Sequence, residues 1–354
     1  MPSINMRSKA LSVKGQGVGS CYEEQVELVK SGLSPEFVVT ENARGVFDII
    51  HYHTINPTYF IERFFTKRRS IGVGYVHFLP DTLEESLHLP RLIRAILYKY
   101  VLSFYNSMDY LVTVNPFMIQ RIKDYNITNP EVTCITNYVS EERFPIMQEK
   151  DILGVKERYH IPTDRFIVLG VGQLQTRKGV IDFVETAKLC PEVTFVWAGG
   201  FSFGRITDGY EQIKQVVDNP PSNVIFTGIV DRTEMPGLYN ACDLMFLPSF
   251  EELFPMSILE ALCCKKPILL RDVPLYENIL MSGYLKGKNP VEFASRVHEL
   301  TSSVENYKNW QDLAWQLHAL YLKEATLDKW RMFYRAVSLK QSVPQLSNTK
   351  EDSI

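Results

Sequence analysis

The sequence predicts an α/β protein with two doubly wound parallel sheets. Short apolar runs of strand length alternate with segments of helical periodicity along nearly the whole chain, a pattern typical of parallel sheets with crossover helices. The alternation occurs in two sets, one in each half of the chain. With 354 residues, of which 45% are hydrophobic, the chain is long enough to bury two cores. We therefore expect two doubly wound domains that face one another.

The first domain is expected to span residues 1–150. A charged segment at 140–165 contains Pro145, Gly154 and Pro162, and this composition favours a domain boundary there. Five apolar runs before it are predicted to be strands. They are residues 37–40, 48–53, 71–78, 110–114 and 132–136.

The second domain is expected to span residues 151–310. Its predicted strands are residues 166–172, 193–200, 223–228, 244–249 and 267–272. After residue 291 the pattern becomes purely helical, and we expect crossover helices at 311–340. The polar residues 341–354 are predicted to form a disordered tail.

Composition excludes several classes of protein. The net charge of −3 lacks the basic excess that is typical of nucleic-acid binders. Charged residues interrupt every apolar stretch before it reaches the roughly eighteen residues of a membrane-spanning helix. The N-terminal residues lack the apolar segment of a secretory signal, which predicts an intracellular protein. The six cysteines lack the spacing of metal ligands, so we interpret them as reduced core thiols.

The stretch FEELFPMSILEALCC, residues 250–264, contains two candidate functional carboxylates. It follows the strand at 244–249, at the edge where parallel sheets bind ligands. Pro255 suits the first position of a helix, so Glu252 lies in the loop and Glu260 in the second turn of a largely apolar helix. Either Glu could be an ordinary surface charge, but a carboxylate on a buried helix requires a polar partner.

A sugar diol is such a partner, because one carboxylate can accept hydrogen bonds from two neighbouring hydroxyls. One Glu could thus hold a ribose and the other a second sugar. The helix N-terminus between them favours phosphate oxygens. The stretch therefore indicates a nucleotide-sugar site.

A second candidate site is GVGQLQTRKGVIDF, residues 170–183, which has the pattern of a strand, a glycine turn and a helix. Arg177 and Lys178 at its mouth could stabilise a departing diphosphate, although they could also be a solvated charge pair. The chain has no Asp-x-Asp pair that would hold a divalent metal. We therefore expect no metal and no cofactor, and a diphosphate would depend on these cations.

These motifs resemble those of retaining glycosyltransferase family 4, whose members have the GT-B fold of two Rossmann-like domains. The resemblance extends from about residue 4 to about residue 335 and is carried by the Glu-x-Phe-Pro-x-x-x-x-Glu-Ala pattern at 252–261, GQGVGS, GQLQTRKG, WAGG, FTGIV and LYNACDLMFLPS. More narrowly, INMRS, HYHTINPTYF, YVHFLPDTLEESL and WAGGFSFGRITDGY resemble bacterial α-galactosyl-glucosyl-diacylglycerol synthases. In such relatives the C-terminal helix, here 327–337, crosses back to brace the first domain.

The resemblance implies a role for individual residues. Arg177 and Lys178 correspond to the cations at the donor diphosphate, Glu260 to the ribose-binding carboxylate, and Glu252 to the carboxylate at the transferred sugar. The other positions that correspond to donor-binding residues are Gly17 and Val18 in a mobile glycine loop, Gln173, Phe254, Pro255, Met256 and Ser257. Many relatives have Arg in place of Gln173, so one phosphate contact is neutral in this chain and Arg177 would compensate.

Three histidines invite either a catalytic or a packing interpretation. His51 and His53 alternate on one predicted strand and therefore face the same side of it. Core packing explains them at least as well as catalysis. His77 ends an apolar strand just before a loop, where it could contact ligand or pack. The resemblance assigns His77 to the side of the transferred sugar.

The resemblance also implies the reaction and its place. Retention by front-face substitution would require no protein nucleophile, with Glu252 positioning the sugar and Arg177 and Lys178 stabilising the diphosphate. The expected reaction transfers a hexose, with galactose favoured, from a UDP-sugar to glucosyl-diacylglycerol. The product, a dihexosyl-diacylglycerol, would serve as a membrane glycolipid or lipoteichoic acid anchor.

A membrane-facing surface is predicted in the first domain. Residues 89–105 form an amphipathic helix, and residues 63–70 mix cations with aromatic rings, a composition that suits an anionic bilayer surface. The helix could also simply pack on its own sheet. Attachment at the cytoplasmic face of the membrane is the expectation. The cations assigned to it are Arg63, Lys67, Arg68, Arg69, Arg91, Arg94 and Lys99.

Alternatives remain open at this point. Glucosyl transfer to diacylglycerol or glucosyl-diacylglycerol is one, since galactose and glucose differ at a single hydroxyl. A soluble family 4 enzyme with a non-lipid acceptor is another. A third is a non-catalytic nucleotide-sugar-binding scaffold, which would not need Glu252, Glu260 and Lys178 together.

Overall fold

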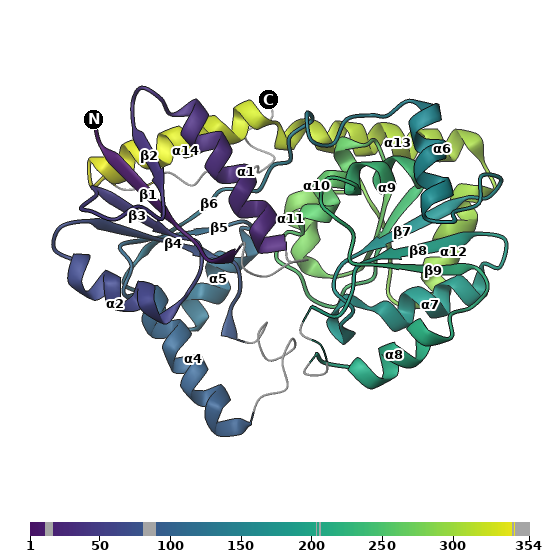
Figure 1. Cartoon of the computed structure of the whole chain (residues 1–354), viewed down its shortest axis with the longest axis horizontal. Helices are drawn as coiled ribbons and strands as arrows, with labels where there is room; N and C mark the ends of the chain where they lie inside the picture. Colours follow the sequence, from purple (N-terminus) through teal and green to yellow (C-terminus); the bar gives the residue numbers. More distant parts are fainter. Residues whose placement is uncertain (11–16, 81–89, 203, 205–206, 342, 344–354) are drawn as a thin grey trace. The chain divides into compact units, whose positions relative to one another are not determined.

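The computed structural model of the protein describes the chain except for residues 11–16, 81–89, 203, 205–206, 342 and 344–354. The chain forms two compact units (Figure 1). It passes from the first unit to the second at Tyr138–Val139 and returns at Leu320–Tyr321. The predicted boundary at residue 150 falls inside the second unit, because helix α6 (Glu149–Arg158) packs against α9 (Met235–Ala241) of that unit. The predicted tail at 341–354 lies largely outside the described residues.

The first unit is built on a parallel sheet with the strand order β2-β1-β3-β4-β5-β6. The strands are β1 (Ser3–Arg7), β2 (Val38–Glu41), β3 (Ile49–Tyr52), β4 (Ile71–Val76), β5 (Tyr110–Thr113) and β6 (Glu131–Cys134). The described helices are α1 (Gly17–Gly32), α2 (Pro57–Thr66), α4 (Arg91–Asn106), α5 (Phe117–Asp124) and the C-terminal α14 (Lys323–Ser338).

Helices cover both faces of this sheet. His51 and Tyr52 are neighbours on β3 and therefore point to opposite faces. The Nδ1 atom of His51 lies 2.7 Å from the hydroxyl of Tyr334 on α14, whereas Tyr52 contacts Phe104 on α4. The predicted return of the C-terminal helix to the first domain is thus present, and α14 packs beside α1 on the same face (Figure 1).

The second unit has a parallel sheet with the strand order β12-β11-β10-β7-β8-β9. Its strands are β7 (Ile167–Val171), β8 (Thr194–Ala198), β9 (Val224–Gly228), β10 (Leu244–Leu247), β11 (Ile268–Arg271) and β12 (Leu285–Gly287). Its remaining described helices are α7 (Val180–Leu189), α8 (Tyr210–Asp218), α10 (Met256–Cys263), α11 (Glu277–Leu280), α12 (Pro290–Thr301) and α13 (Val304–His318).

An aromatic core holds the second unit together. Phe183 of α7 contacts both Trp197 of β8 and Phe246 of β10, and Phe246 also contacts Phe293 of α12. All four side chains are fully buried. Burying large apolar side chains contributes on the order of 1.5–3 kcal/mol each, so these contacts fix the strands whose ends carry the candidate site.

All ten predicted strands are present, and two further strands complete the sheets. The sequence SINMR of β1 was not predicted as a strand, because three of its five residues are polar. Asn5 is nevertheless buried, where its side chain bonds the backbone of Ala43. The strand β12 has three residues, which are too few to show the alternation of apolar and polar residues that predicts a strand.

In the chain as described, no helix combines the length and apolar character that crossing a membrane requires.

Candidate active site

The loop after β7 carries Arg177 and Lys178. A single 3-10 turn at Thr176–Lys178 is followed by Gly179 in the left-handed conformation (φ +71°), and α7 begins directly after it. A Cβ atom at Gly179 would lie 2.3 Å from the carbonyl oxygen of Pro248. Glycine therefore permits this loop to approach the loop after β10.

Backbone and side-chain bonds join these two loops. The amide of Phe250 donates to the carbonyl of Arg177 at 2.8 Å, and the Arg177 guanidinium donates to the carbonyl of Glu251 at 3.3 Å. Lys178 forms an ion pair with Glu252, and these side chains are 12% and 7% exposed. The two sequence motifs thus meet in one buried pair at the carboxyl edge of the sheet.

Burial and charge act on this pair in opposite directions. Burial by itself raises the pKa of Glu252, but the charges of Lys178 and Arg177 outweigh it and hold that pKa below its usual value. Burial lowers the pKa of Lys178, and the adjacent Glu252 charge limits the shift. An ionised Glu252 therefore holds a cation beside it at neutral pH.

Glu260 lies in the middle of α10 and is buried. The phenol of Tyr239 on α9 donates to its Oε2 at 2.7 Å, and the guanidinium of Arg232 donates to its Oε1 at 2.7 Å. Phe144 packs against both partners. The ring centroids of Phe144 and Tyr239 are 5.8 Å apart, and the guanidinium carbon of Arg232 lies 5.3 Å from the centroid of the Phe144 ring. The buried carboxylate that the sequence predicts is thus present, and both its oxygens accept hydrogen bonds.

The residues between the two carboxylates form the start of α10. The helix begins at Met256, one residue after the predicted position, because Pro255 has an extended conformation and precedes the first turn. Phe254, Met256 and Ser257 are buried. Gln173 is half-buried in the turn that follows β7.

The expected residues of the first unit lie at the carboxyl ends of its strands. Gly17 and Val18 begin α1, and the first two residues of the predicted glycine loop, 15 and 16, lie outside the described residues. His77 follows β4 and stacks on Tyr75, with ring centroids 4.3 Å apart. Burial lowers the pKa of His77 to about 3, so the ring is neutral at physiological pH.

His51 and His53 take the packing role. His51 bonds Tyr334 and contacts Trp330, both on α14. His53 is buried between Tyr22 and Tyr75, with ring centroids 5.0 and 5.2 Å away. These two rings therefore form part of the aromatic core of the first unit.

Helices α2 and α4 of the first unit present an apolar and basic surface to solvent. The helices contact each other through Phe60 and Tyr100, and Figure 1 shows the N-terminal end of α4 extending away from the sheet. We define the α2–α4 surface by two sets of exposed residues. The large apolar side chains, each between 52% and 79% exposed, are Ile61, Phe64, Phe65, Leu92, Ile93 and Ile96. The exposed cations are Lys67, Arg68, Arg69, Arg91, Arg94 and Lys99.

The C-terminal half of α4 packs on its own unit, since Val101 and Phe104 are buried. The packing interpretation of this helix therefore holds for one face of its second half, whereas residues 91–96 are all exposed.

The prediction that Arg63 lies on the membrane-facing surface is wrong. Its side chain is 1% exposed and forms an ion pair with Asp109 at 2.6 Å. It also donates to the carbonyl oxygens of Ser107 and Ser70 at 2.9 and 3.0 Å. These three partners satisfy the guanidinium inside the unit, so Arg63 is a structural residue.

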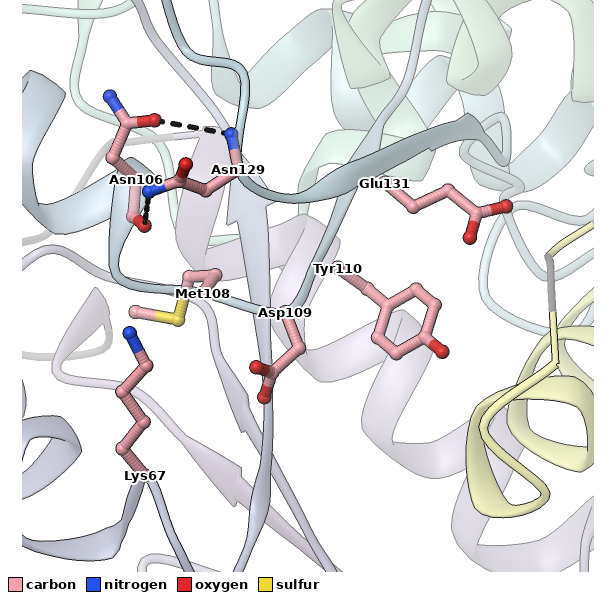
Figure 2. Close-up of a pocket in the computed structure, with 7 residues that line it drawn as sticks. All are labelled: Lys67, Asn106, Met108, Asp109, Tyr110, Asn129 and Glu131. Carbon is pink, nitrogen blue, oxygen red and sulfur yellow. Dashed lines mark hydrogen bonds between the residues drawn. The ribbon is translucent and has the colours of Figure 1, made fainter.

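A cavity of about 410 Å³ lies beside this buried arginine. It is at the amino ends of β5 and β6, whereas parallel sheets bind ligands at the carboxyl ends of their strands. Figure 2 shows Asn106 and Asn129 bonded to each other on one side of it. The lining residues are Lys67, Asn106, Met108, Asp109, Tyr110, Asn129 and Glu131. We assign this cavity no part in the candidate site.

Two residues of the site were not predicted from the sequence. Arg232 lies in the loop after β9 and Tyr239 lies on α9, both outside the motif that contains Glu260. A carboxylate buried on an apolar helix implies such donors, but its sequence neighbours do not say which element supplies them. Among the described residues, no group of three or more potential ligands could hold a metal ion.

Known proteins resemble this chain in sequence and in fold. Residues 154–320 match the family model of glycosyl transferases group 1. The alpha-galactosylglucosyldiacylglycerol synthase of Streptococcus pneumoniae is 41% identical over 94% of this chain and 88% of its own length. The processive diacylglycerol alpha-glucosyltransferase of Acholeplasma laidlawii is 28% identical over 90% of this chain and 95% of its own.

The structure of Anabaena HepE in complex with UDP-glucose matches with a TM-score of 0.75 at 15% identity, covering 95% of this chain and 100% of that chain. The expected fold is thus confirmed by structural similarity, and the expected family by sequence similarity along most of the chain. The chain belongs to the group 1 glycosyltransferases and has the GT-B fold.

Proposed function

We propose that this protein transfers galactose from UDP-galactose to glucosyl-diacylglycerol and so forms a dihexosyl-diacylglycerol. The observation that carries the proposal is the 41% identity to a galactosylglucosyldiacylglycerol synthase over 94% of the chain. The bound UDP-glucose in the structural neighbour HepE supports a UDP-sugar as the donor.

The second unit supplies the groups that such a donor requires. Lys178 and Arg177 lie at the carboxyl edge of the sheet, where they would neutralise the diphosphate. The N-terminus of α10 would direct backbone amides toward phosphate and sugar oxygens. Glu260 would accept hydrogen bonds from the ribose hydroxyls, and Glu252 would accept them from the transferred hexose.

Binding the donor would rearrange the Lys178–Glu252 pair. In the structure these side chains neutralise each other. A diphosphate that attracts Lys178 would leave Glu252 to accept hydrogen bonds from the sugar hydroxyls. The ion pair would thus keep both groups charged and positioned until the donor replaces each partner.

The proposed reaction retains the configuration at the anomeric carbon. The bond between that carbon and the diphosphate oxygen breaks, and the bond to the acceptor hydroxyl oxygen forms on the same face. The acceptor proton passes to a phosphate oxygen, so no side chain acts as nucleophile. Lys178 and Arg177 stabilise the charge that develops on the leaving diphosphate, and we propose that no metal ion is needed for this step.

Residues of the first unit are assigned by resemblance. We propose that His77 contacts the transferred sugar and that Gly17 and Val18 contribute to the donor site. A neutral His77 suits this role, because it can donate or accept a hydrogen bond without adding charge.

The acceptor is a lipid, and the α2–α4 surface is the proposed membrane contact. Six large apolar side chains are exposed on two adjoining helices, which is uncommon on a surface that faces only water. The six cations among them would attract anionic headgroups, each contributing about 1 kcal/mol near the surface. We propose that the protein binds the cytoplasmic face of the cell membrane through this surface.

The experiment that tests the function offers UDP-galactose and UDP-glucose separately to the purified protein, with vesicles that contain diacylglycerol or glucosyl-diacylglycerol. EDTA is present throughout. We expect a dihexosyl lipid from UDP-galactose and glucosyl-diacylglycerol only. Product from UDP-glucose would instead indicate glucosyl transfer, the activity named for the Acholeplasma relative.

Two controls sharpen this experiment. The Glu252→Ala protein should bind vesicles as the wild type does and form little product. If the wild type binds the donor and forms no lipid product with either acceptor, the proposed acceptor is wrong and a non-lipid acceptor becomes the favoured hypothesis.

A further inference from the structure

The carboxylate of Glu260 is held by two donors from its own unit, Tyr239 and Arg232. We propose that these two are positioning residues, which fix Glu260 so that it accepts one hydrogen bond from each of the two ribose hydroxyls of the donor. The protein would therefore select ribonucleotides over deoxyribonucleotides. This inference rests on the proposed function, because it takes the donor to be a UDP-sugar.

The number of acceptor positions on the carboxylate supports this inference. Each carboxylate oxygen has two lone pairs. The Oε2 atom accepts from Tyr239 and the Oε1 atom from Arg232, both at 2.7 Å. One lone pair on each oxygen remains for a ligand. Two vicinal hydroxyls on adjacent ribose carbons match this arrangement of one remaining position on each oxygen.

Tyr239 is suited to act as a permanent donor. Its side chain is 0% exposed, and burial together with the charge of Glu260 raises its pKa well above the usual value. The phenol therefore keeps its proton at any physiological pH. Its ring lies on α9, which packs against α10, so the hydroxyl has a fixed direction relative to Glu260.

Arg232 donates to the other carboxylate oxygen of Glu260, Oε1. Its side chain is 28% exposed, so it reaches the carboxylate from the solvent side. Phe144 contacts Tyr239 and Arg232 alike and limits the movement of both. With a donor on each oxygen, the carboxylate cannot rotate about its Cγ–Cδ bond without losing a charge-assisted hydrogen bond.

Removing the phenol hydroxyl should therefore affect ribose recognition specifically. In Tyr239→Phe the ring still packs against Phe144, but Oε2 has lost its buried donor. The carboxylate can then rotate toward Arg232 and present a different edge to the ligand. Losing one hydrogen bond to a charged group weakens binding roughly ten- to a hundredfold. We expect the preference for UDP over a deoxy analogue to be of this size.

The test measures binding of UDP, 2′-deoxy-UDP and 3′-deoxy-UDP to the full-length protein by titration calorimetry. We expect the wild type to bind UDP roughly ten- to a hundredfold more tightly than either deoxy analogue. Tyr239→Phe should weaken UDP binding and bring this ratio close to one. In steady-state assays, the same variant should raise KM for the donor with little change in kcat, because the ribose does not react.

A matched control is Tyr307→Phe, which removes a phenol hydroxyl that donates to the backbone carbonyl of Asp243 at 3.0 Å in the same unit. Its ratio of UDP to deoxy-UDP affinity should equal that of the wild type. If Tyr239→Phe does not fold, Arg232→Met provides the same measurement from the more exposed side of the carboxylate.

The outcomes distinguish this inference from the function on which it rests. A folded Tyr239→Phe protein with the wild-type ratio would overturn the inference and leave the proposed function intact. A wild type that binds no UDP at all would overturn both.

Discussion

Replacing Lys178 with methionine removes the cation beside Glu252 and keeps most of the side-chain volume. The two side chains are 12% and 7% exposed, so water screens the remaining carboxylate poorly. Removing one partner of a buried ion pair typically costs about 3–5 kcal/mol of folding free energy. For a unit the size of Val139–Leu320 this corresponds to a fall in Tm on the order of 10 °C.

A second substitution tests the cause of this loss. Glu252→Gln in the Lys178→Met background removes the charge that the first substitution left without its partner. We expect the double variant to be more stable than Lys178→Met alone. The matched control is Lys188→Met, since the Lys188–Glu185 pair is 52% and 46% exposed and its loss should change stability by less than about 1 kcal/mol.

The pH dependence of stability gives an independent check. In the wild type the pKa of Glu252 is held below its usual value, so the pair stabilises the folded state above the usual carboxyl pKa. That contribution is lost as pH falls through the lower, folded-state pKa. In Lys178→Met burial dominates and the pKa of Glu252 rises, so the stability difference from the wild type should shrink as the solution is acidified.

The assay is thermal unfolding followed by circular dichroism at several pH values for the three variants and the wild type. If Lys178→Met melts with the wild type at pH 7 and gains nothing from Glu252→Gln, the pair is not a buried ionised pair. The ion pair between Lys178 and Glu252, on which the proposed donor site depends, would then be wrongly assigned.

Three further predictions concern the site, the membrane and the histidines. Glu260→Ala should raise the donor KM with little change in kcat, whereas Glu252→Ala should lower kcat more than donor affinity; steady-state kinetics with varied donor check both. Serine at both Phe64 and Phe65 should weaken vesicle binding at least tenfold in a sedimentation assay, since burying each ring contributes about 1.5–3 kcal/mol. Burial lowers the pKa of His77 from 6.5 to about 3, so the first unit should lose stability as pH falls from 6.5 toward 3. Burial also lowers the pKa values of His51 and His53, so His77→Gln should reduce this pH dependence in denaturant titrations without abolishing it.

Each of these has a result that would contradict it. Equal kinetic constants for the two glutamate variants would remove the division of roles between them. Val291→Ser, at an apolar residue 69% exposed on α12, is the control for vesicle binding and should behave as the wild type. A His77→Gln stability curve that follows the wild type through the acidic range would show that the ring does not contribute to it.

The sequence predicts the sheets well because their strands are apolar runs bounded by turn residues. The strands it misses are β1, in which three of the five side chains are polar, and β12, which has three residues. In both, pairing with neighbouring strands decides the structure, and β1 pairs with β2 and β3 on either side. The order of apolar and polar residues within one short segment does not reveal which strands it will pair with.

The residues of the candidate site were likewise only partly predictable from the sequence. Glu252 and Glu260 could be identified because their spacing and the helix between them lie in one continuous stretch. Tyr239 and Arg232 could not, because they reach Glu260 from α9 and from the loop after β9. Arg63 looked like part of a basic surface, but its partner Asp109 is distant in the sequence and only folding brings the two together.

The C-terminal helix α14 has a consequence for synthesis on the ribosome. Trp330 and Tyr334 of α14 pack against His51 of β3, so the hydrophobic core of the first unit includes residues that are translated only after the second unit. The second unit, Val139–Leu320, is continuous in sequence and lies entirely before α14. The second unit can therefore complete its fold during translation, whereas the first has to wait with part of its core exposed, reversing the usual order in which N-terminal domains fold first. A nascent chain stalled before α14 emerges should accordingly be cleaved by protease in its first 138 residues while the second unit resists.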